Sequence, residues 1–222
     1  MKPTRFLIFD LDGTLIDSSE GVVESVNYSL RMMNQPEQPP EKIKSFIGFP
    51  LSHMYPVFTD VSLDELYSHF RVKADEVVVA SAVMLDGVRD TLELLRADGY
   101  RMAIATTKVR RNIDGIMDRF GWHDVFEVTV GGDEVARQKP EPDAFIQALE
   151  RLGADPEQAL VVGDTVNDIL AAQAVPMRIA AVTSPYGGLE EIRALRPNFM
   201  IDSIRELPSI LESGKDFKEE AI

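Results

Sequence analysis

The stretch FLIFDLDGTL, residues 6–15, combines a short apolar run with two closely spaced acids. Its opening apolar residues are bounded by polar ones, a pattern typical of a buried strand. Side chains two positions apart in an extended chain point the same way, so Asp10 and Asp12 can reach one site. A strand that runs straight into these acids places them at the carboxyl end of a sheet, where open α/β sheets bind ligands. For this segment alone, the alternative is an ordinary turn favoured by Asp and Gly.

From residue 86 onward, strand-like and helix-like patterns alternate along the chain. Strands are predicted over 102–105, 125–130, 159–162, 179–182 and 199–201. Helices are predicted over 88–97, 109–120, 142–152, 169–175, 189–195 and 204–211. Such alternation is typical of a parallel sheet covered by helices on both faces. The charged tail, residues 214–222, is expected to fray.

The block from residue 16 to residue 85 shows helical periodicity and no convincing strand. Apolar residues recur at helical spacing from Ser19 to Asn34, and the prolines that follow end that helix. Further helices are predicted over 41–46, 51–58 and 63–83. We therefore expect an α/β core made of residues 1–15 and 86–222, with an all-helical domain, residues 16–85, inserted between its first two strands.

Composition and charge restrict the classes of function. The chain has 222 residues, of which 45% are hydrophobic and 27% charged, as in ordinary globular proteins. There is no apolar run long enough for a membrane span, no room for a signal peptide before the first strand, and no cysteine. We therefore expect a cytoplasmic protein without a membrane partner. The 23 basic and 37 acidic residues give a net charge of −14, which argues against nucleic acid as a partner.

Polar residues also follow the later predicted strands. They are Thr106, Thr107 and Lys108 after the second strand, Lys139 after the third, and Asp164 and Asp168 after the fourth. Because parallel strands end at one edge of a sheet, we expect these groups to meet Asp10 and Asp12 there. Two like charges about 4 Å apart cost roughly 4 kcal/mol at an effective dielectric constant of about 20, so four carboxylates need a cation. Hard oxygen ligands suit Mg²⁺, which also takes a phosphate oxygen, so we expect Mg²⁺ as cofactor and a phosphorylated ligand.

These motifs, in this order, resemble the haloacid dehalogenase-like hydrolase superfamily. The match runs from Asp-x-Asp-Gly-Thr at 10–14, through Thr106 and Lys139, to Gly-Asp-Thr-x-x-Asp at 163–168. The inserted helices resemble the cap of its phosphoglycolate phosphatase-like branch. The resemblance implies a Rossmann-like core and a Mg²⁺-dependent phosphatase acting on a small phosphorylated metabolite, with 2-phosphoglycolate as a candidate. One departure is AAQAVPM at 171–177, where the superfamily usually runs to Ala-Gly.

The resemblance also implies roles for the motif residues. Asp10 is expected to be the nucleophile that forms an aspartyl-phosphate, and Asp12 the general acid for the leaving alcohol and then the base for water. Thr106 is expected to donate a hydrogen bond to the phosphoryl oxygens, and Lys139 to place positive charge beside them. The metal is expected to be bound by Asp10, Asp164 and the backbone carbonyl of Asp12. Asp168 is expected to orient a metal-bound water, although it could simply be a solvated helix acid.

The remaining expected contacts concern the substrate. Those residues are Gly13, Thr14, Thr107, Lys108 and, in the turn at 46–50 of the insertion, Gly48. Lys108 is equally well explained as a solvated charge, and Gly48 as an ordinary helix end. The resemblance implies that the cap closes over the site and excludes water, with two hinge strands near 14–19 and 81–87. A small anionic substrate would need a cap cation, and the sequence does not choose among Lys42, Lys44, Arg71, Lys73, His53 and His69.

Several alternatives stay open at this level. A β-phosphoglucomutase-like sugar phosphomutase would also use Asp12, but that branch usually carries an Arg-bearing cap motif and a Ser-Ala-Ser-type second motif, which this chain lacks. A pyrophosphatase of the same branch is a further alternative. A non-catalytic protein that binds a phosphorylated ligand is the alternative from another class, because a fold alone does not give a function. The chain is compatible with a monomer or a homodimer.

Overall fold

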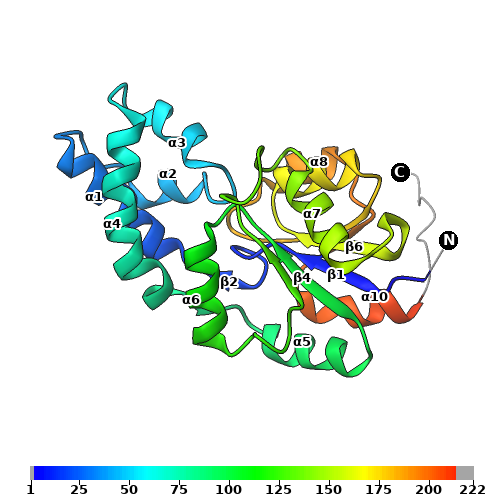
Figure 1. Cartoon of the computed structure of the whole chain (residues 1–222). Coiled ribbons are helices and arrows are strands. Elements are labelled where there is room, and N and C mark those ends of the chain that lie inside the picture. Colours follow the sequence, from blue (N-terminus) through cyan, green and yellow to red (C-terminus); the bar gives the residue numbers. More distant parts are fainter. Residues whose placement is uncertain (1–2, 214–222) are drawn as a thin grey trace.

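A parallel sheet forms the centre of the computed structural model, which describes residues 3–213 (Figure 1). Within those residues it has six strands in the order β5-β4-β1-β6-β7-β8, and all neighbours are parallel. The strands are β1 (Phe6–Phe9), β4 (Arg101–Ala105), β5 (Val128–Val130), β6 (Ala159–Gly163), β7 (Arg178–Val182) and β8 (Phe199–Ile201). This confirms the predicted α/β, Rossmann-like core and places β1, which leads into the first motif, in the middle of the sheet.

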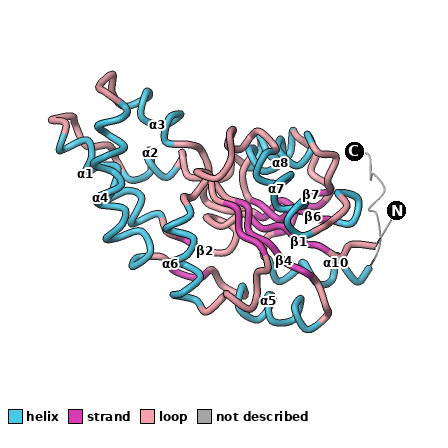
Figure 2. The backbone as a smooth tube through the Cα atoms, viewed as in Figure 1, coloured by secondary structure: helices cyan, strands magenta, loops and turns pink. Residues whose placement is uncertain are grey.

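Helices cover both faces of the sheet, because its central strand is apolar on both sides (Figure 2). Leu7 and Phe9 pack in one core with residues of α5, α6 and α10, whereas Phe6 and Ile8 pack in another with residues of α7, α8 and α9. These helices are α5 (Val88–Ala97), α6 (Arg110–Phe120), α7 (Asp143–Leu152), α8 (Val166–Ala174), α9 (Leu189–Ala194) and α10 (Leu207–Ser213). A strand buried on both faces requires a continuous apolar run, so polar residues begin only at its carboxyl end.

Four helices between β1 and α5 form a cap beside the sheet (Figure 1). They are α1 (Ser19–Met32), α2 (Pro40–Lys44), α3 (Leu51–Phe58) and α4 (Leu63–Ser81). The cap has its own apolar core, whose fully buried members include Val26, Leu30, Ile43, Tyr55 and Leu66. α1 and α4 cross closely, since a Cβ on Gly21 would lie 2.7 Å from the Cα of Val78. The predicted helical insertion is confirmed, while its limits at residues 16 and 85 stay a prediction.

Two short strands, β2 (Ile16–Asp17) and β3 (Val83–Met84), pair antiparallel where the chain leaves the core and returns to it. The periodicity showed no strand between residues 14 and 85 and placed Val83 in a helix, which is wrong, whereas the resemblance implied strands at these two crossings. Two residues are too few to show a strand period in sequence, and they pair only because the two crossings meet in space. Both strands lie within the stretches expected to be hinges.

Two other predicted elements differ in extent. β5 begins at Val128 rather than at residue 125, because the backbone N–H groups of Val125 and Phe126 both donate to the Trp122 carbonyl in a turn. The predicted helix at 204–211 is divided into a 3₁₀ turn, Ile204–Glu206, and α10. A second 3₁₀ turn, Pro156–Gln158, precedes β6. The tail at 214–222, expected to fray, lies outside the described residues.

The cap contacts the core on two sides. A Cβ on Gly115 of α6 would lie 2.9 Å from Val79 Cγ2 of α4, so these two helices approach closely. Asp75 of α4 also forms an ion pair with Arg111 of α6. On the other side, Asn167 Nδ2 of α8 donates to the Gly48 carbonyl at 3.0 Å. These contacts hold the cap over the carboxyl edge of the sheet.

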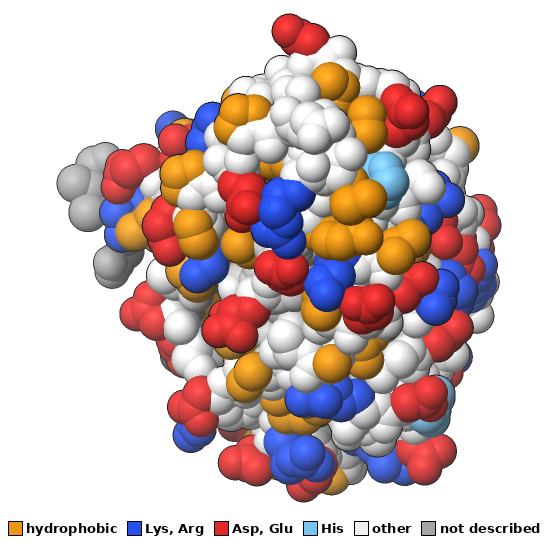
Figure 3. Space-filling view, turned by 90° about the vertical axis from the view of Figure 1, so that its left-hand side faces the viewer, with side chains coloured by type: hydrophobic (Ala, Val, Ile, Leu, Met, Phe, Trp, Pro, Cys, Tyr) orange, Lys and Arg blue, Asp and Glu red, His pale blue; other side chains and the backbone are white. Residues whose placement is uncertain are grey.

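The charged side chains of the cap end are mixed rather than sorted by sign. Figure 3 views the molecule from that end and shows acidic and basic side chains interspersed among apolar ones. None of the helices within residues 3–213 combines the length and the apolar character that a bilayer crossing needs.

Candidate active site

Lys139 lies between two carboxylates at the carboxyl end of β1. Its Nζ donates to Asp10 Oδ1 and to Asp168 Oδ1, both at 2.6 Å, and to the Ala105 carbonyl at 3.2 Å. Lys139 and Asp10 each expose only 2% of their surface, and Asp168 is fully buried. Asp10 follows β1, Lys139 lies in the loop between β5 and α7, and Asp168 lies in α8. The expected meeting of strand ends is therefore present for these three residues.

Burial and neighbouring charge set the protonation of this group. Burial raises the pKa of Asp10 to about 6, while Lys139 opposes that rise and the Asp168 carboxylate adds to it. Burial by itself would lower the pKa of Lys139, but Asp10 and Asp168 outweigh it and raise that pKa above its usual value. At neutral pH, Asp10 is thus mainly ionised and Lys139 stays charged. An ionised carboxylate removed from water is suited to nucleophilic attack.

Asp164, at the end of β6, is fully buried beside this group. Thr14 Oγ1 donates to its Oδ1 at 3.1 Å, and Ser184 Oγ donates to its Oδ2 at 2.5 Å. Gly13 has a φ of +81°, and a Cβ there would lie 2.0 Å from Asp164 Oδ2. Only glycine therefore leaves room for Asp164. From the sequence, Gly13 was expected to be a substrate contact instead.

The acids of this edge fit a divalent cation. Asp10, Asp164 and Asp168 offer carboxylate oxygens that lie within 4.8 Å of one another. Burial raises the pKa of Asp164 well above its usual value, and repulsion from Asp168 and Asp10 raises it further. One lysine cannot balance three buried carboxylates, so a hard divalent ion would complete the charge of the cluster.

The three acids are not equivalent as possible ligands. Lys139 occupies Oδ1 of Asp168, and the backbone N–H and hydroxyl of Thr165 donate to its Oδ2 at 3.0 and 2.7 Å. Among the described residues, no hydrogen bond is donated to Asp10 Oδ2. Asp164 is bound only by two hydroxyl groups, which can rotate. Asp10 and Asp164 are therefore the acids best placed to hold a cation. Both oxygens of Asp168 already accept hydrogen bonds, from Lys139 and from Thr165 at the start of α8.

Asp12 belongs to a second polar group. Lys108 Nζ donates to Asp12 Oδ2 at 2.6 Å and to Ser18 Oγ at 2.8 Å, and Ser18 Oγ donates to Asp12 Oδ1 at 2.6 Å. All three residues are buried. The Asp12 side chain is thus held apart from the cluster of Asp10, Asp164 and Asp168, and Lys108 is a buried partner of Asp12 rather than a solvated charge.

A cavity of about 760 Å³ lies between the cap and the core. The core contributes polar groups to its lining, namely Asp12, Thr107, Lys108, Asn112, Asp133, Gln138, Lys139 and Asn167. The cap contributes Gly48 and a mainly apolar wall that includes Phe46, Ile47, Phe49, Leu51, Met54 and Phe70. A ligand in this cavity would contact polar groups of the core at one end and the apolar wall of the cap at the other, as is typical of small-molecule sites.

The predicted substrate contacts divide between this cavity and its surroundings. Gly48, Thr107 and Lys108 line the cavity, whereas the Thr14 hydroxyl is used by Asp164. Thr106 is buried, and its Oγ1 accepts a hydrogen bond from the Lys108 backbone N–H at 3.3 Å. Thr106 therefore shapes the turn that carries Thr107 and Lys108.

The sequence did not assign roles to Ser18, Ser184 and Asn167. Ser184 follows β7, so the rule that parallel strands end at one edge could have identified it. Ser18 directly precedes α1 and has the sequence position of a helix cap, but its hydroxyl donates to Asp12 instead. The contact of Asn167 with Gly48 depends on how the cap docks, and no local pattern indicates it.

Comparisons with known proteins agree with this geometry. The family model of haloacid dehalogenase-like hydrolases matches residues 7–182. The chain belongs to this family. It is 31% identical over 219 residues to a phosphoglycolate phosphatase of Psychrobacter arcticus, covering 93% of this chain and 95% of that protein. It is 34% identical over 209 residues to the pyrophosphatase PpaX of Bacillus pumilus, covering 92% of this chain and 95% of that protein.

A solved structure shares the whole architecture of this haloacid dehalogenase-like hydrolase. It is described as a predicted phosphatase from Clostridium acetobutylicum, and it matches with a TM-score of 0.87 at 26% identity, covering 95% of this chain and 100% of that one. Family membership confirms the resemblance seen in the motifs and the expected enzyme class, a phosphoric monoester hydrolase of the phosphoglycolate phosphatase-like branch.

The cap turn of this hydrolase can be tested with two glycine substitutions. Gly48 has a φ of +88°, and a Cβ there would lie 2.6 Å from Thr165 Cγ2, whereas Gly99 has a φ of +82° with nothing within 4 Å. Both Gly→Ala variants should lose about 1–2 kcal/mol of unfolding free energy from backbone strain. Only Gly48→Ala should displace the cap turn, and we expect its kcat/KM to fall about 10- to 100-fold.

Urea unfolding and p-nitrophenyl phosphate hydrolysis measure the two effects separately. Gly99→Ala is the matched control, because it carries the same backbone strain without the contact. Equal kcat/KM values for the two variants would show that the cap turn does not position the site.

Proposed function

We propose that this chain is a Mg²⁺-dependent phosphatase that hydrolyses a small phosphomonoester through an aspartyl-phosphate on Asp10. The observation that carries the proposal is the buried Asp10 carboxylate, held 2.6 Å from Lys139 Nζ beside the Asp164 carboxylate. A buried nucleophile with a fixed cation next to it is arranged to bind charge that develops on a transferring phosphoryl group. Asp10, Asp164 and the Asp12 carbonyl would hold Mg²⁺, which supplies Lewis-acid stabilisation of the phosphoryl oxygens when bound.

The proposed reaction has two steps. In the first, Asp10 Oδ2 attacks phosphorus, the bond from phosphorus to the alcohol oxygen breaks, and the Asp12 carboxyl gives its proton to that oxygen. In the second, water attacks the phosphorus of the aspartyl-phosphate and gives a proton to the Asp12 carboxylate, releasing phosphate and free Asp10. Lys139 and the turn at Thr106 and Thr107 would bind the phosphoryl oxygens. Asp168 would fix Lys139, whose Nζ donates a hydrogen bond to Asp168 Oδ1 at 2.6 Å.

Two candidate substrates follow from the relatives. A phosphoglycolate phosphatase and a pyrophosphatase are similar over nearly the whole chain. We propose 2-phosphoglycolate first, because the enzyme class is that of monoester hydrolases, and pyrophosphate second. Either is a small phosphorylated compound that a cavity of about 760 Å³ can hold.

The proposal includes the organisation and setting of the enzyme. We propose a catalytic core of residues 1–15 and 86–222 and a cap of residues 16–85, with β2 and β3 as the hinge that lets the cap open for substrate. The antiparallel pairing of Ile16–Asp17 with Val83–Met84 supports this hinge, because the chain passes between the core and the cap at these two strands. A cytoplasmic location is supported by a sequence without cysteine.

A phosphate-release assay tests the proposal. Purified protein should release inorganic phosphate from p-nitrophenyl phosphate in the presence of Mg²⁺, and chelation with EDTA should abolish that release. Across 2-phosphoglycolate, pyrophosphate, hexose phosphates and mononucleotides, we expect the highest kcat/KM for 2-phosphoglycolate. Conversion of a hexose phosphate to its isomer without free phosphate would instead indicate a mutase, and no turnover of any compound would favour a binding protein.

A further inference from the structure

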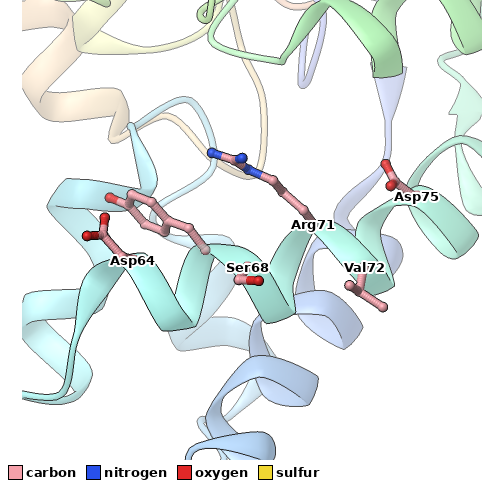
Figure 4. Close-up of a pocket in the computed structure, with 6 residues that line it drawn as sticks. Asp64, Ser68, Arg71, Val72 and Asp75 are labelled. Atoms are coloured by element: carbon pink, nitrogen blue, oxygen red, sulfur yellow. The ribbon is translucent and has the colours of Figure 1, made fainter.

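Arg71, on α4, is a cap cation that lines the cavity above the candidate active site. It also lines a neighbouring hollow of about 450 Å³ on the same helix, together with Asp64, Tyr67, Ser68, Val72 and Asp75. In Figure 4, Arg71 and Asp75 project to the same side of α4, and the guanidinium extends well away from the helix. The Arg71 side chain is therefore at the opening of the cavity and free to reach a ligand inside it.

Three lysines of the cap are engaged elsewhere. Lys42 donates to Gln38 and lies over the Phe58 ring, and Lys44 forms an ion pair with Glu41. Lys73 pairs with Glu76. None of these three lysines lines the cavity. The structure thus distinguishes among candidates that the sequence left equal.

Among the described residues, Arg71 differs from the two lysines of the cavity in having no acidic partner. Lys139 is shared by Asp10 and Asp168, and Lys108 is held by Asp12. Within residues 3–213, no ion pair or hydrogen bond engages the Arg71 guanidinium. Asp75, one helical turn away on the same side, is already paired with Arg111. His53, a further cap residue at the cavity, stacks its ring on Phe49 at 5.3 Å.

Acidic residues outnumber basic ones in this chain of net charge −14, yet none of them pairs with Arg71 among residues 3–213. The five N–H donors of its guanidinium form a planar fork that matches a carboxylate or a phosphate in two parallel hydrogen bonds. The apolar cap wall, with Phe46, Phe49 and Phe70, lines the same cavity, and apolar surroundings strengthen a charge pair relative to open water.

We propose that Arg71 determines specificity by binding a second anionic group of the substrate, a carboxylate or a further phosphate, while the scissile phosphate lies at Asp10. This rests on the proposed phosphatase function and deepens it. The substrate class is then a short phosphoester or phosphoanhydride with two anionic ends, and monoesters with a neutral or apolar end are poorer substrates.

The test compares 2-phosphoglycolate with ethyl phosphate, which have nearly the same size but differ in the second anionic group. In Arg71→Gln, kcat/KM for 2-phosphoglycolate should fall about 10- to 100-fold, mainly through KM, as expected for a lost charge-assisted pair. For ethyl phosphate, the same variant should change kcat/KM less than about twofold, since no contact to that compound is removed. Arg31→Gln is the matched control, because it removes the same charge from a cap residue that pairs with Glu24 and Glu37 away from the cavity.

The outcomes separate this inference from the proposed function. Suppose that the wild type hydrolyses both compounds. If Arg71→Gln then loses kcat/KM equally for the two compounds, or for neither, the role of Arg71 is overturned and the proposed phosphatase function still holds. A fall of the same size in Arg31→Gln would show a general charge effect and would also overturn it. Absence of Mg²⁺-dependent hydrolysis of p-nitrophenyl phosphate by the wild type would instead reject the phosphatase. Partial restoration of 2-phosphoglycolate turnover in Arg71→Lys would support a charge contact at this position.

Discussion

Replacing Asp10 with asparagine should lower kcat for p-nitrophenyl phosphate hydrolysis by about 10⁴-fold or more, the scale seen when a covalent nucleophile is removed. The amide keeps the shape of the side chain but cannot attack phosphorus. Lys139 keeps one partner in this variant, because Asp168 still accepts from its Nζ at 2.6 Å. The fold should therefore survive, and circular dichroism should be unchanged.

Asp118→Asn is the control for this variant. Asp118 is an exposed aspartate that pairs with His123 at 2.7 Å, remote in function from the site, and its loss should leave kcat unchanged. Acid quenching of the wild type during turnover, followed by peptide mass analysis, should find a phosphoryl group on Asp10. Residual activity in Asp10→Asn above about a tenth of wild type, well over the level expected for a lost nucleophile, would remove Asp10 from that role.

Replacing Lys139 with methionine should lower both stability and activity. The variant leaves Asp10, Asp164 and Asp168 buried without a cation, and breaking a buried pair by removing one partner typically costs about 3–5 kcal/mol. We expect a loss of that size in unfolding free energy at pH 7.5 without metal, and a fall in kcat of about 10²- to 10³-fold, as for a lost electrostatic contact to the transition state. Mg²⁺ should restore part of the stability, because it would bind the same acids.

The pH dependence of this loss has a definite sign. Burial raises the folded-state pKa of Asp10 from 3.8 to about 6, so its contribution to stability is present at low pH and is lost as pH rises through that value. Lys139 lowers the pKa of Asp10, so replacing Lys139 raises that pKa further. The stabilising contribution of the protonated Asp10 is then lost over a range that reaches higher pH. The stability difference between wild type and Lys139→Met should therefore be larger at pH 7.5 than at pH 4.5.

Urea unfolding at both pH values measures this difference. Lys44→Met is the matched control, because Lys44 forms only a 3.7 Å pair with the exposed Glu41, and such pairs contribute about 0–1 kcal/mol. Equal losses in the two variants would mean that Lys139 is not needed to balance the buried acids.

The edge of the sheet at which these polar groups meet was predictable because its determinants are local. The apolar run before Asp10 is typical of a strand buried on both faces, and parallel strands end at a common edge. That rule places Asp10, Lys139, Asp164 and Asp168 together without any knowledge of distances, and the structure shows them within hydrogen-bonding or ligand range of one another. The helical character of the insertion followed from periodicity in the same way.

The partners of long side chains were not predictable from local patterns. Lys108 was as well explained by solvent as by a ligand, until the turn after β4 placed its Nζ 2.6 Å from Asp12. Periodicity did not show the two-residue strands β2 and β3, because their pairing joins residues far apart in the chain. The need for Gly13 likewise became specific only when Asp164 was seen to occupy the space of its Cβ.

The order of apolar runs and acids along this chain therefore determined by itself the sheet, the helical insertion and the edge at which chemistry is placed. Only the tertiary structure decided which charges are paired, how the cap lies over that edge, and that Arg71 rather than Lys42, Lys44 or Lys73 faces the cavity. The physical reason is range. Strand burial and helical periodicity are set by neighbours within a few residues, whereas a charge finds its partner through the packing of separate elements.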